Sequence, residues 1–482
     1  MNFSFVIRVT GLLLLVEAAA LLISLLVSLS FGDGDAQAIG WSALSCALPG
    51  ILAVLFTGRA PRTITRSEGF LIVTLVWLVF SLFGALPYVL SDSIPRYTDA
   101  FFETMSGFTT TGASIVDHID SFPHGILFWR SITHWLGGMG IIVLFLTLMP
   151  AFGIGGMQLY DAEVPGLSVE KISPRIHQTA RIVWGVYVLL TLVETILLMF
   201  GGMSLFDSVC HAFATMATGG FSTKQASIAF WPSPYIQYVI TFFMFLAGTN
   251  FTLLYFAGRG KFSRIFRDEE FKYYFLFVLG FTVLIFSGLL VTTTLPAENA
   301  FRDSIFTVVS IITTTGFVTA DYLMWSPVLY MLVFLLFFFG GSTGSTGGGI
   351  KIMRIVLLLK NSYYELRRII HPSAVIPVRF NRHAIESRVI SNVLAFFMFY
   401  LMVVFISTVI LMIFEPDMGT SLGAVASCLG NIGPGLGSVG PAFTYSHIPD
   451  AGKWFLSFLM MLGRLELFTV LVIFTPSFWT EQ

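Results

Sequence analysis

Long hydrophobic runs alternate with short polar segments along the whole of this sequence. An α-helix needs about 20 mostly apolar residues to cross a bilayer core of about 30 Å. Runs of this kind predict about ten transmembrane helices and therefore an all-α polytopic membrane protein. The predicted spans lie at roughly 5–30, 38–58, 69–91, 125–150, 178–201, 233–257, 272–295, 325–345, 388–414 and 452–475.

Composition excludes a soluble protein. Hydrophobic residues make up 56% of the chain and charged residues only 11%, against about 25% charged residues in a typical soluble domain. The formal net charge of −1 gives no indication of a nucleic-acid partner. The three cysteines, Cys46, Cys210 and Cys428, lack the spacing of a metal site or a disulfide framework.

Charged residues predict the orientation of the chain in the membrane. Basic residues gather in three alternate loops, at 59–66, 259–272 and 351–388, whereas the loops between them are mainly acidic. The positive-inside rule places basic loops in the cytoplasm. Both termini are therefore predicted to be cytoplasmic, and the basic segment 351–388 offers a docking surface for a cytosolic regulator.

Four of the loops on the opposite side share a pattern. Each contains an apolar stretch too short to span a membrane, followed by small polar residues and a glycine. The stretches are 101–108, 205–216, 301–312 and 421–429. The glycines, separated by 108, 96 and 117 residues, are Gly112, Gly220, Gly316 and Gly433. A single loop of this kind would be read as an ordinary surface turn. Four at near-regular spacing predict four repeated units, each made of a helix, a half-helix, an extended return and a second helix.

Non-helical backbone is tolerated at membrane depth only where it lines a protein or water cavity. The four returns are therefore predicted to share a central pore by fourfold pseudosymmetry, with the first two helices outside the repeat. Glycine permits positive φ, and carbonyl and threonine oxygens can replace the water shell of a monovalent cation. The predicted cation-binding residues are Thr110, Thr111, Gly112, Thr218, Gly219, Gly220, Thr314, Thr315, Gly316, Asn431, Ile432 and Gly433.

A glycine-rich stretch interrupts the eighth predicted span. Six glycines in ten residues are incompatible with a stable helix, because each costs about 1 kcal/mol relative to alanine. We expect the stretch to unwind and to line or plug the pore as a gate, although small residues also permit a close-packed helix crossing. Its residues are Gly340, Gly341, Ser342, Thr343, Gly344, Ser345, Thr346, Gly347, Gly348 and Gly349.

Arg464 is expected near the bilayer centre, about 16 Å into the last predicted helix at 1.5 Å per residue. An arginine at this depth costs at least about 2.5–3.5 kcal/mol on insertion scales. Two interpretations remain open: a buried ion pair with Glu466 or another helix, or a cation that faces the pore. Glu466 follows after only two residues, which directs it to another face of a helix.

Other motifs predict no chemistry. The G-x-G-x-x-G pattern at 435–440 follows no strand and precedes Pro441, so it does not predict a nucleotide site. The segment 344–351 lacks the Gly-Lys-Ser/Thr of a P-loop. His134 and His211 are expected to be hydrogen-bonded core residues. Because acid and base residues do not cluster at one depth, the chain is not expected to be an enzyme.

Several motifs together resemble the Trk-type (TrkH-like) potassium transporter membrane subunits, of which the KtrB and plant HKT proteins are more distant relatives. The resemblance covers nearly the whole chain, including the extra N-terminal helix pair. It rests on the segments 135–140 (WLGGMG), 162–166 (AEVPG), 216–222 (MATGGFS), 340–349 and 463–466 (GRLE).

The resemblance implies that the twelve predicted cation-binding residues form a potassium filter. All four family glycines are present, although Gly219 and the pair Asn431 and Ile432 depart from the threonine pattern. It also implies that residues 340–349 are an intramembrane gating loop, that Arg464 faces the pore, and that the chain acts in a bacterial inner membrane. A homodimer and a TrkA-like, nucleotide-binding cytosolic ring are the implied partners, and no organic cofactor is implied.

The predicted units are 1–66 (helix pair), 67–173, 174–267, 268–380 (with the glycine-rich loop) and 381–482. An organic-solute carrier is disfavoured, because the units run in the same direction and such carriers often contain inverted repeats. A sodium-permeable transporter and symport coupled to a proton or a sodium ion remain open alternatives.

Overall fold

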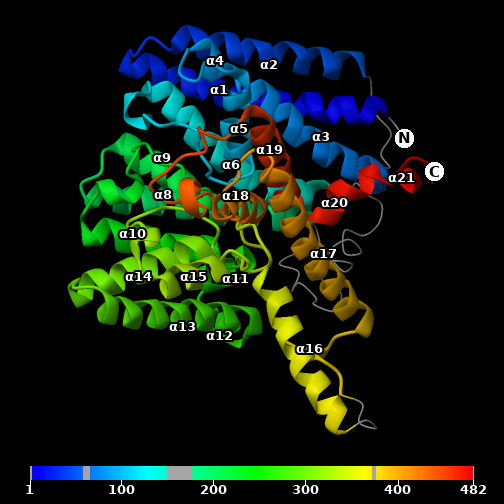
Figure 1. The fold of residues 1–482 in the computed structure, drawn as a ribbon. Helices are drawn as coiled ribbons and strands as arrows, with labels where there is room; N and C mark the ends of the chain where they lie inside the picture. The colour runs from blue at the N-terminus through cyan, green and yellow to red at the C-terminus, as the bar shows by residue number, and fades with distance from the viewer. Residues whose placement is uncertain (1–2, 58–65, 149–175, 372–375, 481–482) are drawn as a thin grey trace.

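The structure, a computed structural model, describes residues 3–57, 66–148, 176–371 and 376–480. Most of the predicted basic loop at 59–66 and the whole of the 162–166 segment lie outside these residues. The helices lie side by side as a bundle, from which α16 (Ile352–Ile370) projects (Figure 1). The beginning of α1 (Phe3–Phe31) and the short helix α21 (Pro476–Thr480) lie at one end of this bundle, which also carries the short basic helix α12 (Phe262–Arg267) (Figure 1).

The N-terminal helices α1 (Phe3–Phe31) and α2 (Ala36–Phe56) form an antiparallel pair. They approach closely where Gly11 faces Gly50, since a β-carbon on Gly11 would lie only 3.1 Å from the carbonyl oxygen of Gly50. Small residues permit such close helix packing within membranes. The pair packs against α3 (Arg66–Gly84) and α6 (His124–Leu148).

Among the remaining elements, a half-helix lies in each of the four loops singled out in the sequence. The boundaries of the repeated units stay a prediction. After α3 come α4 (Leu86–Leu90), α5 (Tyr97–Phe108), η1 (Ile119–Ser121), α6, α8 (Ile176–Phe200), α9 (Leu205–Met216), η2 (Ser227–Phe230), α10 (Pro234–Ala247), α11 (Phe251–Gly258), α12, α13 (Glu269–Thr292), α14 (Ala297–Ile312), η3 (Tyr322–Met324), α15 (Pro327–Leu336) and α16. Then follow β1 (Arg379–Phe380), β2 (His383–Ala384), α17 (Ser387–Leu411), α18 (Met418–Gly430), η4 (Gly437–Val439), α19 (Asp450–Arg464), α20 (Leu467–Leu471), η5 (Val472–Phe474) and α21 (Pro476–Thr480).

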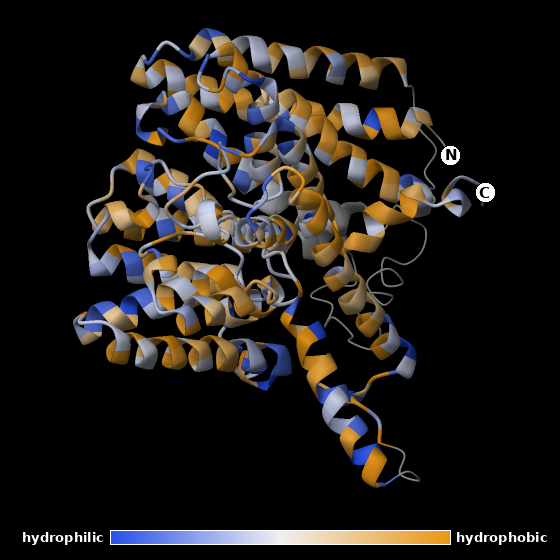
Figure 2. Ribbon diagram, viewed as in Figure 1, coloured by the Kyte–Doolittle hydropathy of each residue, from blue (hydrophilic) through white to orange (hydrophobic). Residues whose placement is uncertain are grey.

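Helix length and apolar surface are those of a polytopic membrane protein. Among the described residues, six helices are long and apolar enough to cross a membrane, or eight if each of two bent pairs is one span. Hydrophobic residues dominate the helix bodies, whereas hydrophilic residues gather toward helix ends and loops (Figure 2). Large apolar side chains on α13, such as Phe275 and Leu276, are exposed, as expected for a surface that contacts lipid.

Three predicted spans are not continuous helices. The span 233–257 bends by 110° between α10 and α11, and the span 452–475 bends by 116° between α19 and α20. The span 325–345 is helical only through Leu336. At the first bend the amide of Phe251 donates to the carbonyl of Gly344 at 3.1 Å, and Ser342 donates to the carbonyl of Gly248 at 2.8 Å. The glycine-rich loop thus satisfies the backbone groups that the break leaves without helical partners.

Candidate functional site

Four half-helices, α5, α9, α14 and α18, end with the same backbone conformation. The residue two positions before each predicted glycine has a left-handed φ, and the next residue donates its amide to a carbonyl five residues earlier at 2.8–3.0 Å. These left-handed residues are Thr110 (52°), Thr218 (54°), Thr314 (59°) and Asn431 (53°). Threonine seldom adopts this conformation, so its occurrence at three matching positions marks a strained, shared design.

The four segments meet in a closed ring. Each of the four glycines also has positive φ. Each lies against a carbonyl oxygen of the next segment, and this oxygen belongs to the residue just before that segment's own glycine. The contacts join Gly112 to Gly219, Gly220 to Thr315, Gly316 to Ile432 and, closing the circle, Gly433 to Thr111. We call the four residues that contribute these oxygens, Thr111, Gly219, Thr315 and Ile432, the carbonyl ring. A β-carbon at any of the first three glycines would overlap the neighbouring oxygen.

Side chains and helix ends shape the surroundings of the carbonyl ring. The hydroxyls of Thr109 and Thr111 lie 2.8 Å apart, and those of Thr313 and Thr315 repeat this contact at 2.8 Å. Asn431 donates to the hydroxyl of Thr111 at 2.9 Å and thereby links the last segment to the first. The C-terminal ends of four helices also meet here, and their partial negative charge favours a cation.

Gly219 stands where the other two threonine-containing segments have a threonine, and the reason is steric. A β-carbon on Gly219 would overlap the imidazole ring of His134, which is buried and stacks on Phe221 with ring centroids 4.0 Å apart. The expectation for His211 holds, because its ring nitrogens contact the carbonyl of Asp207 at 2.7 Å and the hydroxyl of Ser222 at 2.9 Å. For His134 it is wrong: its nitrogens have no hydrogen-bond partner among the described residues.

A buried ion pair behind the carbonyl ring was not predicted. Arg130 on α6 contacts Glu103 on α5 at 2.7 Å, and both side chains are almost fully buried. Glu103 also accepts from the amide of Ile115 at 2.9 Å, and Arg130 donates to the carbonyl of Ser222 at 2.8 Å. The pair therefore holds the backbone that follows the first and second ring segments. Charged residues within apolar helices are the sequence signal that could have identified it.

The glycine-rich loop, residues 340–349, is not helical and packs against the inner ends of the ring segments. Thr346 donates to the carbonyl of Met216 at 2.9 Å, where α9 ends, and the amide of Gly348 donates to the hydroxyl of Thr314 at 2.7 Å. A second anchor is Glu270, whose carboxylate accepts from the amide of Thr343 at 2.7 Å. The loop therefore connects the ring to the beginning of α13.

Arg464 reaches the same loop. It is buried at the end of α19 and donates to the carbonyl of Thr346 at 2.7 Å and, more weakly, to that of Gly137 at 3.4 Å. Among the described residues no carboxylate forms an ion pair with it. Glu466 instead pairs with Arg354 at 2.6 Å. The ion pair between Arg464 and Glu466, one of the two interpretations of Arg464, is therefore not formed. The pore-facing role of Arg464 stays a prediction.

The other motifs have structural roles. The 435–440 segment is a loop containing η4, and the carbonyl of Gly435 accepts from the hydroxyl of Tyr322 at 2.7 Å. No group of His, Cys, Asp and Glu side chains suited to a metal ion occurs in the part of the chain that the structure describes.

Apolar spanning helices and four half-helices that end in one ring define a polytopic membrane transport protein. The family model of TrkH, described as a cation transport protein, matches residues 42–481. The chain therefore belongs to the TrkH family, and the predictions of a Trk-type transporter and of a protein that is not an enzyme are confirmed.

Individual relatives agree with this membership over their full length. The chain is 40% identical to the Trk system potassium uptake protein TrkH of Escherichia coli K12 and 39% identical to that of Halomonas elongata, with 100% of each chain covered. It is also similar to the crystal structure of the potassium transporter TrkH from Vibrio parahaemolyticus. That match has a TM-score of 0.91 and 36% identity and covers 99% of this chain and 100% of the other.

Proposed function

We propose that this chain is the potassium-conducting membrane subunit of a Trk-type uptake system. The observation that carries the proposal is the closed carbonyl ring, in which four segments from distant parts of the chain each place a carbonyl against the next glycine. Oxygens at such a ring replace the water shell of a potassium ion. Membrane potential supplies about 2.3 kcal/mol per charge per 100 mV for inward movement.

In this proposal the twelve residues predicted from the sequence form the filter. The three ring segments with threonine contribute carbonyl and hydroxyl oxygens. In the fourth, Asn431 donates to Thr111 at 2.9 Å and to the carbonyl of Met460 at 2.9 Å. The side-chain NH₂ group of Asn431 therefore supports the ring. The loop at 340–349 is the gate, because its contacts with Met216 and Thr314 place it against the inner ends of two ring segments.

Regulation and assembly complete the proposal. A TrkA-like nucleotide-binding ring would dock on the basic end of the bundle, where α12 and α16 carry Arg264, Arg267, Arg367 and Arg368. The chain would act as a homodimer in a bacterial inner membrane, with both termini in the cytoplasm. A sodium-permeable transporter or a coupled carrier is the alternative function.

The test is uptake of ⁸⁶Rb⁺ into liposomes that contain the purified protein, in competition with K⁺, Na⁺ and Li⁺. Gly316→Ser is the informative variant, since its β-carbon would overlap the carbonyl of Ile432 and φ at this position is 79°. Gly280→Ser is the matched control, because a β-carbon at Gly280 on α13 meets nothing within 4 Å.

Wild type and Gly280→Ser should take up Rb⁺ that K⁺ blocks far better than Li⁺ or Na⁺. In Gly316→Ser this preference should weaken. Robust uptake with unchanged preference in Gly316→Ser would refute the filter and favour the carrier alternative. Equal block by Na⁺ and K⁺ in the wild type would favour the sodium-permeable transporter.

A further inference from the structure

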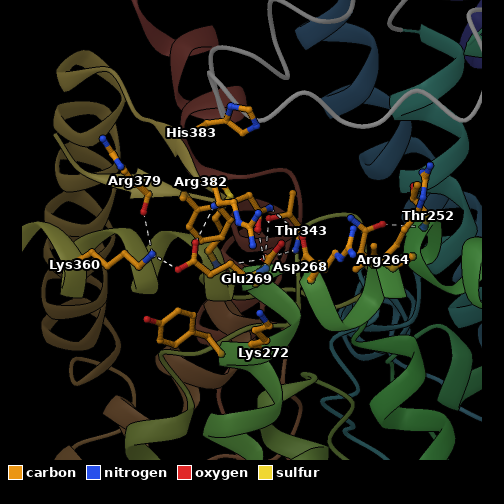
Figure 3. Close-up of a pocket in the computed structure, with 18 of the residues that line it drawn as sticks. Thr252, Arg264, Asp268, Glu269, Lys272, Thr343, Lys360, Arg379, Arg382 and His383 are labelled. Atoms are coloured by element: carbon orange, nitrogen blue, oxygen red, sulfur yellow. Dashed lines mark hydrogen bonds and ion pairs between the residues drawn. The ribbon is translucent and has the colours of Figure 1, made fainter. Parts of the chain in front are cut away.

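A large cavity lies at the basic end of the bundle, and two of its arginines, Arg264 and Arg267, also belong to the docking surface proposed above. Its volume is about 1080 Å³, and it lies between α11, α12, α13, α16 and the β1–β2 hairpin (Figure 3). One gate residue, Thr343, belongs to its lining, as does the gate anchor Glu270. The cavity therefore adjoins the gate loop on the side that the charge pattern predicts to be cytoplasmic.

The cavity carries an excess of positive charge. Six cationic side chains line it, against three carboxylates. The cationic residues are Arg264, Arg267, Lys272, Lys360, Arg379 and Arg382. Each carboxylate already has a partner within the protein: Asp268 accepts from the amide of Phe271 at 2.8 Å, Glu269 pairs with Lys360, and Glu270 accepts from Thr343. Within the described ranges no carboxylate pairs with Arg267, Lys272 or Arg382.

A tight hairpin turn holds one of these cations at the cavity. Asn381 and Arg382 form the two-residue turn between β1 and β2 with φ of 46° and 68°, the geometry that such a hairpin requires. Asn381 fixes this turn to the start of α13: its side chain accepts from the amide of Glu269 at 2.7 Å, and its amide donates to the Glu269 carboxylate at 2.8 Å.

We propose that this cavity binds a phosphate group, carried either by an anionic membrane lipid or by a free phosphate ion. Guanidinium groups bind phosphate through two parallel N–H donors, and basic pockets between membrane helices bind anionic headgroups. Phe256, Tyr273 and Leu276 add apolar lining. Leu276 is also exposed on the outer surface of α13, so acyl chains can continue from the cavity along this helix.

Occupancy of the cavity acts on the gate through Glu270. Its carboxylate accepts from the amide and the hydroxyl of Thr343 at 2.7 and 3.1 Å and from the amide of Met353 at 3.3 Å. One buried carboxylate beside the phosphate site thus holds Thr343 of the gate loop and the first turn of α16, which follows the loop. A phosphate monoanion or dianion in the cavity changes the electrostatic potential at Glu270 and therefore the strength of its hydrogen bonds to the loop. This effect of phosphate binding on the gate rests on the proposed function.

Binding is tested by native mass spectrometry of the purified full chain with dioctanoyl phosphatidylglycerol, dioctanoyl phosphatidylcholine and inorganic phosphate as probes. The variant is Lys272→Gln with Arg382→Gln, and the control is Arg388→Gln, an exposed basic residue outside the cavity. Wild type and control should bind phosphatidylglycerol over phosphatidylcholine. The variant should bind it about 30-fold more weakly, because each basic residue near an anionic lipid contributes a factor of about five.

The probes identify the source of the phosphate. Phosphatidylglycerol binding that inorganic phosphate does not displace assigns the site to a lipid, whereas displacement by inorganic phosphate assigns it to the free ion. Equal affinities of wild type and variant, or equal binding of the two lipids, would overturn the site.

The link to the gate is tested by ⁸⁶Rb⁺ uptake into vesicles of phosphatidylcholine with and without phosphatidylglycerol, and with and without internal phosphate. The anion identified by mass spectrometry should change uptake in wild type and Arg388→Gln but not in the double variant. An equal response in the double variant would refute the link. Rb⁺ uptake that K⁺ fails to block in every vesicle would refute the proposed function and leave the binding result unaffected.

Discussion

The buried pair of Glu103 and Arg130 allows a quantitative test of how the carbonyl ring is supported. Glu103→Gln removes the negative charge and preserves the shape of the side chain. Arg130, which is 2% exposed, then lies in the protein interior without a counter-charge. The amide group of the new glutamine can still accept from Ile115, so loss of the ion pair is the main perturbation.

The size of the effect follows from burial. Removal of one partner from a buried ion pair costs about 3–5 kcal/mol of folding free energy. The same change in an exposed pair costs about 0–1 kcal/mol, and Arg96 with Asp450 is such a pair, with side chains 59% and 47% exposed. The double variant Glu103→Leu, Arg130→Met should lose less than the sum of the two single variants, because it leaves no buried charge. Its remaining cost is about 1–3 kcal/mol for each backbone group that loses its partner, the amide of Ile115 and the carbonyl of Ser222.

The assay is equilibrium unfolding of the purified protein in detergent by denaturant, with Asp450→Asn as the control. Selectivity is measured in parallel by ⁸⁶Rb⁺ uptake, since Arg130 also holds the carbonyl of Ser222 behind the second ring segment. Glu103→Gln should lose both stability and preference for K⁺. A loss no greater than that of Asp450→Asn, or a double variant as unstable as the sum of the singles, would refute the reasoning.

Three further predictions concern the ring, the gate and a helix cap. Asn431→Gly permits the left-handed φ of 53° but removes both hydrogen bonds that the side chain donates. It should lower the free energy of unfolding by about 1–3 kcal/mol, and K⁺ should block ⁸⁶Rb⁺ uptake less strongly. Arg464→Gln frees the carbonyl of Thr346 and should raise ⁸⁶Rb⁺ uptake in the absence of a regulator; unchanged uptake would argue against this anchor. Asp417 caps α18 by accepting from Thr420, which lowers the pKa of its carboxyl. The cap therefore stabilises the fold fully above the ordinary pKa of 3.8, and this stabilisation is lost as the pH falls through the lower folded-state pKa. In acid unfolding, Asp417→Asn should not show the loss of stability that protonation of Asp417 causes in the wild type.

Much of the fold could be predicted because membrane helices are encoded locally. A run of apolar residues predicts a span without knowledge of its neighbours, and the half-helices α9 and α14 end at Met216 and Ile312 as the sequence indicated. The positions with positive φ were also locally encoded in part, since glycine marks four of them. The left-handed threonines were not predicted, because threonine alone disfavours that conformation.

Local residue patterns were enough to predict the class of the protein and the four places where backbone must be buried without helical hydrogen bonds. Only the folded chain shows which groups satisfy that backbone. The bend between α10 and α11 exists because Gly344 accepts from Phe251, 93 residues away in sequence. Gly219 is required because His134 occupies the space of a side chain. Such contacts join segments brought together only by folding, and no local pattern of residues encodes them.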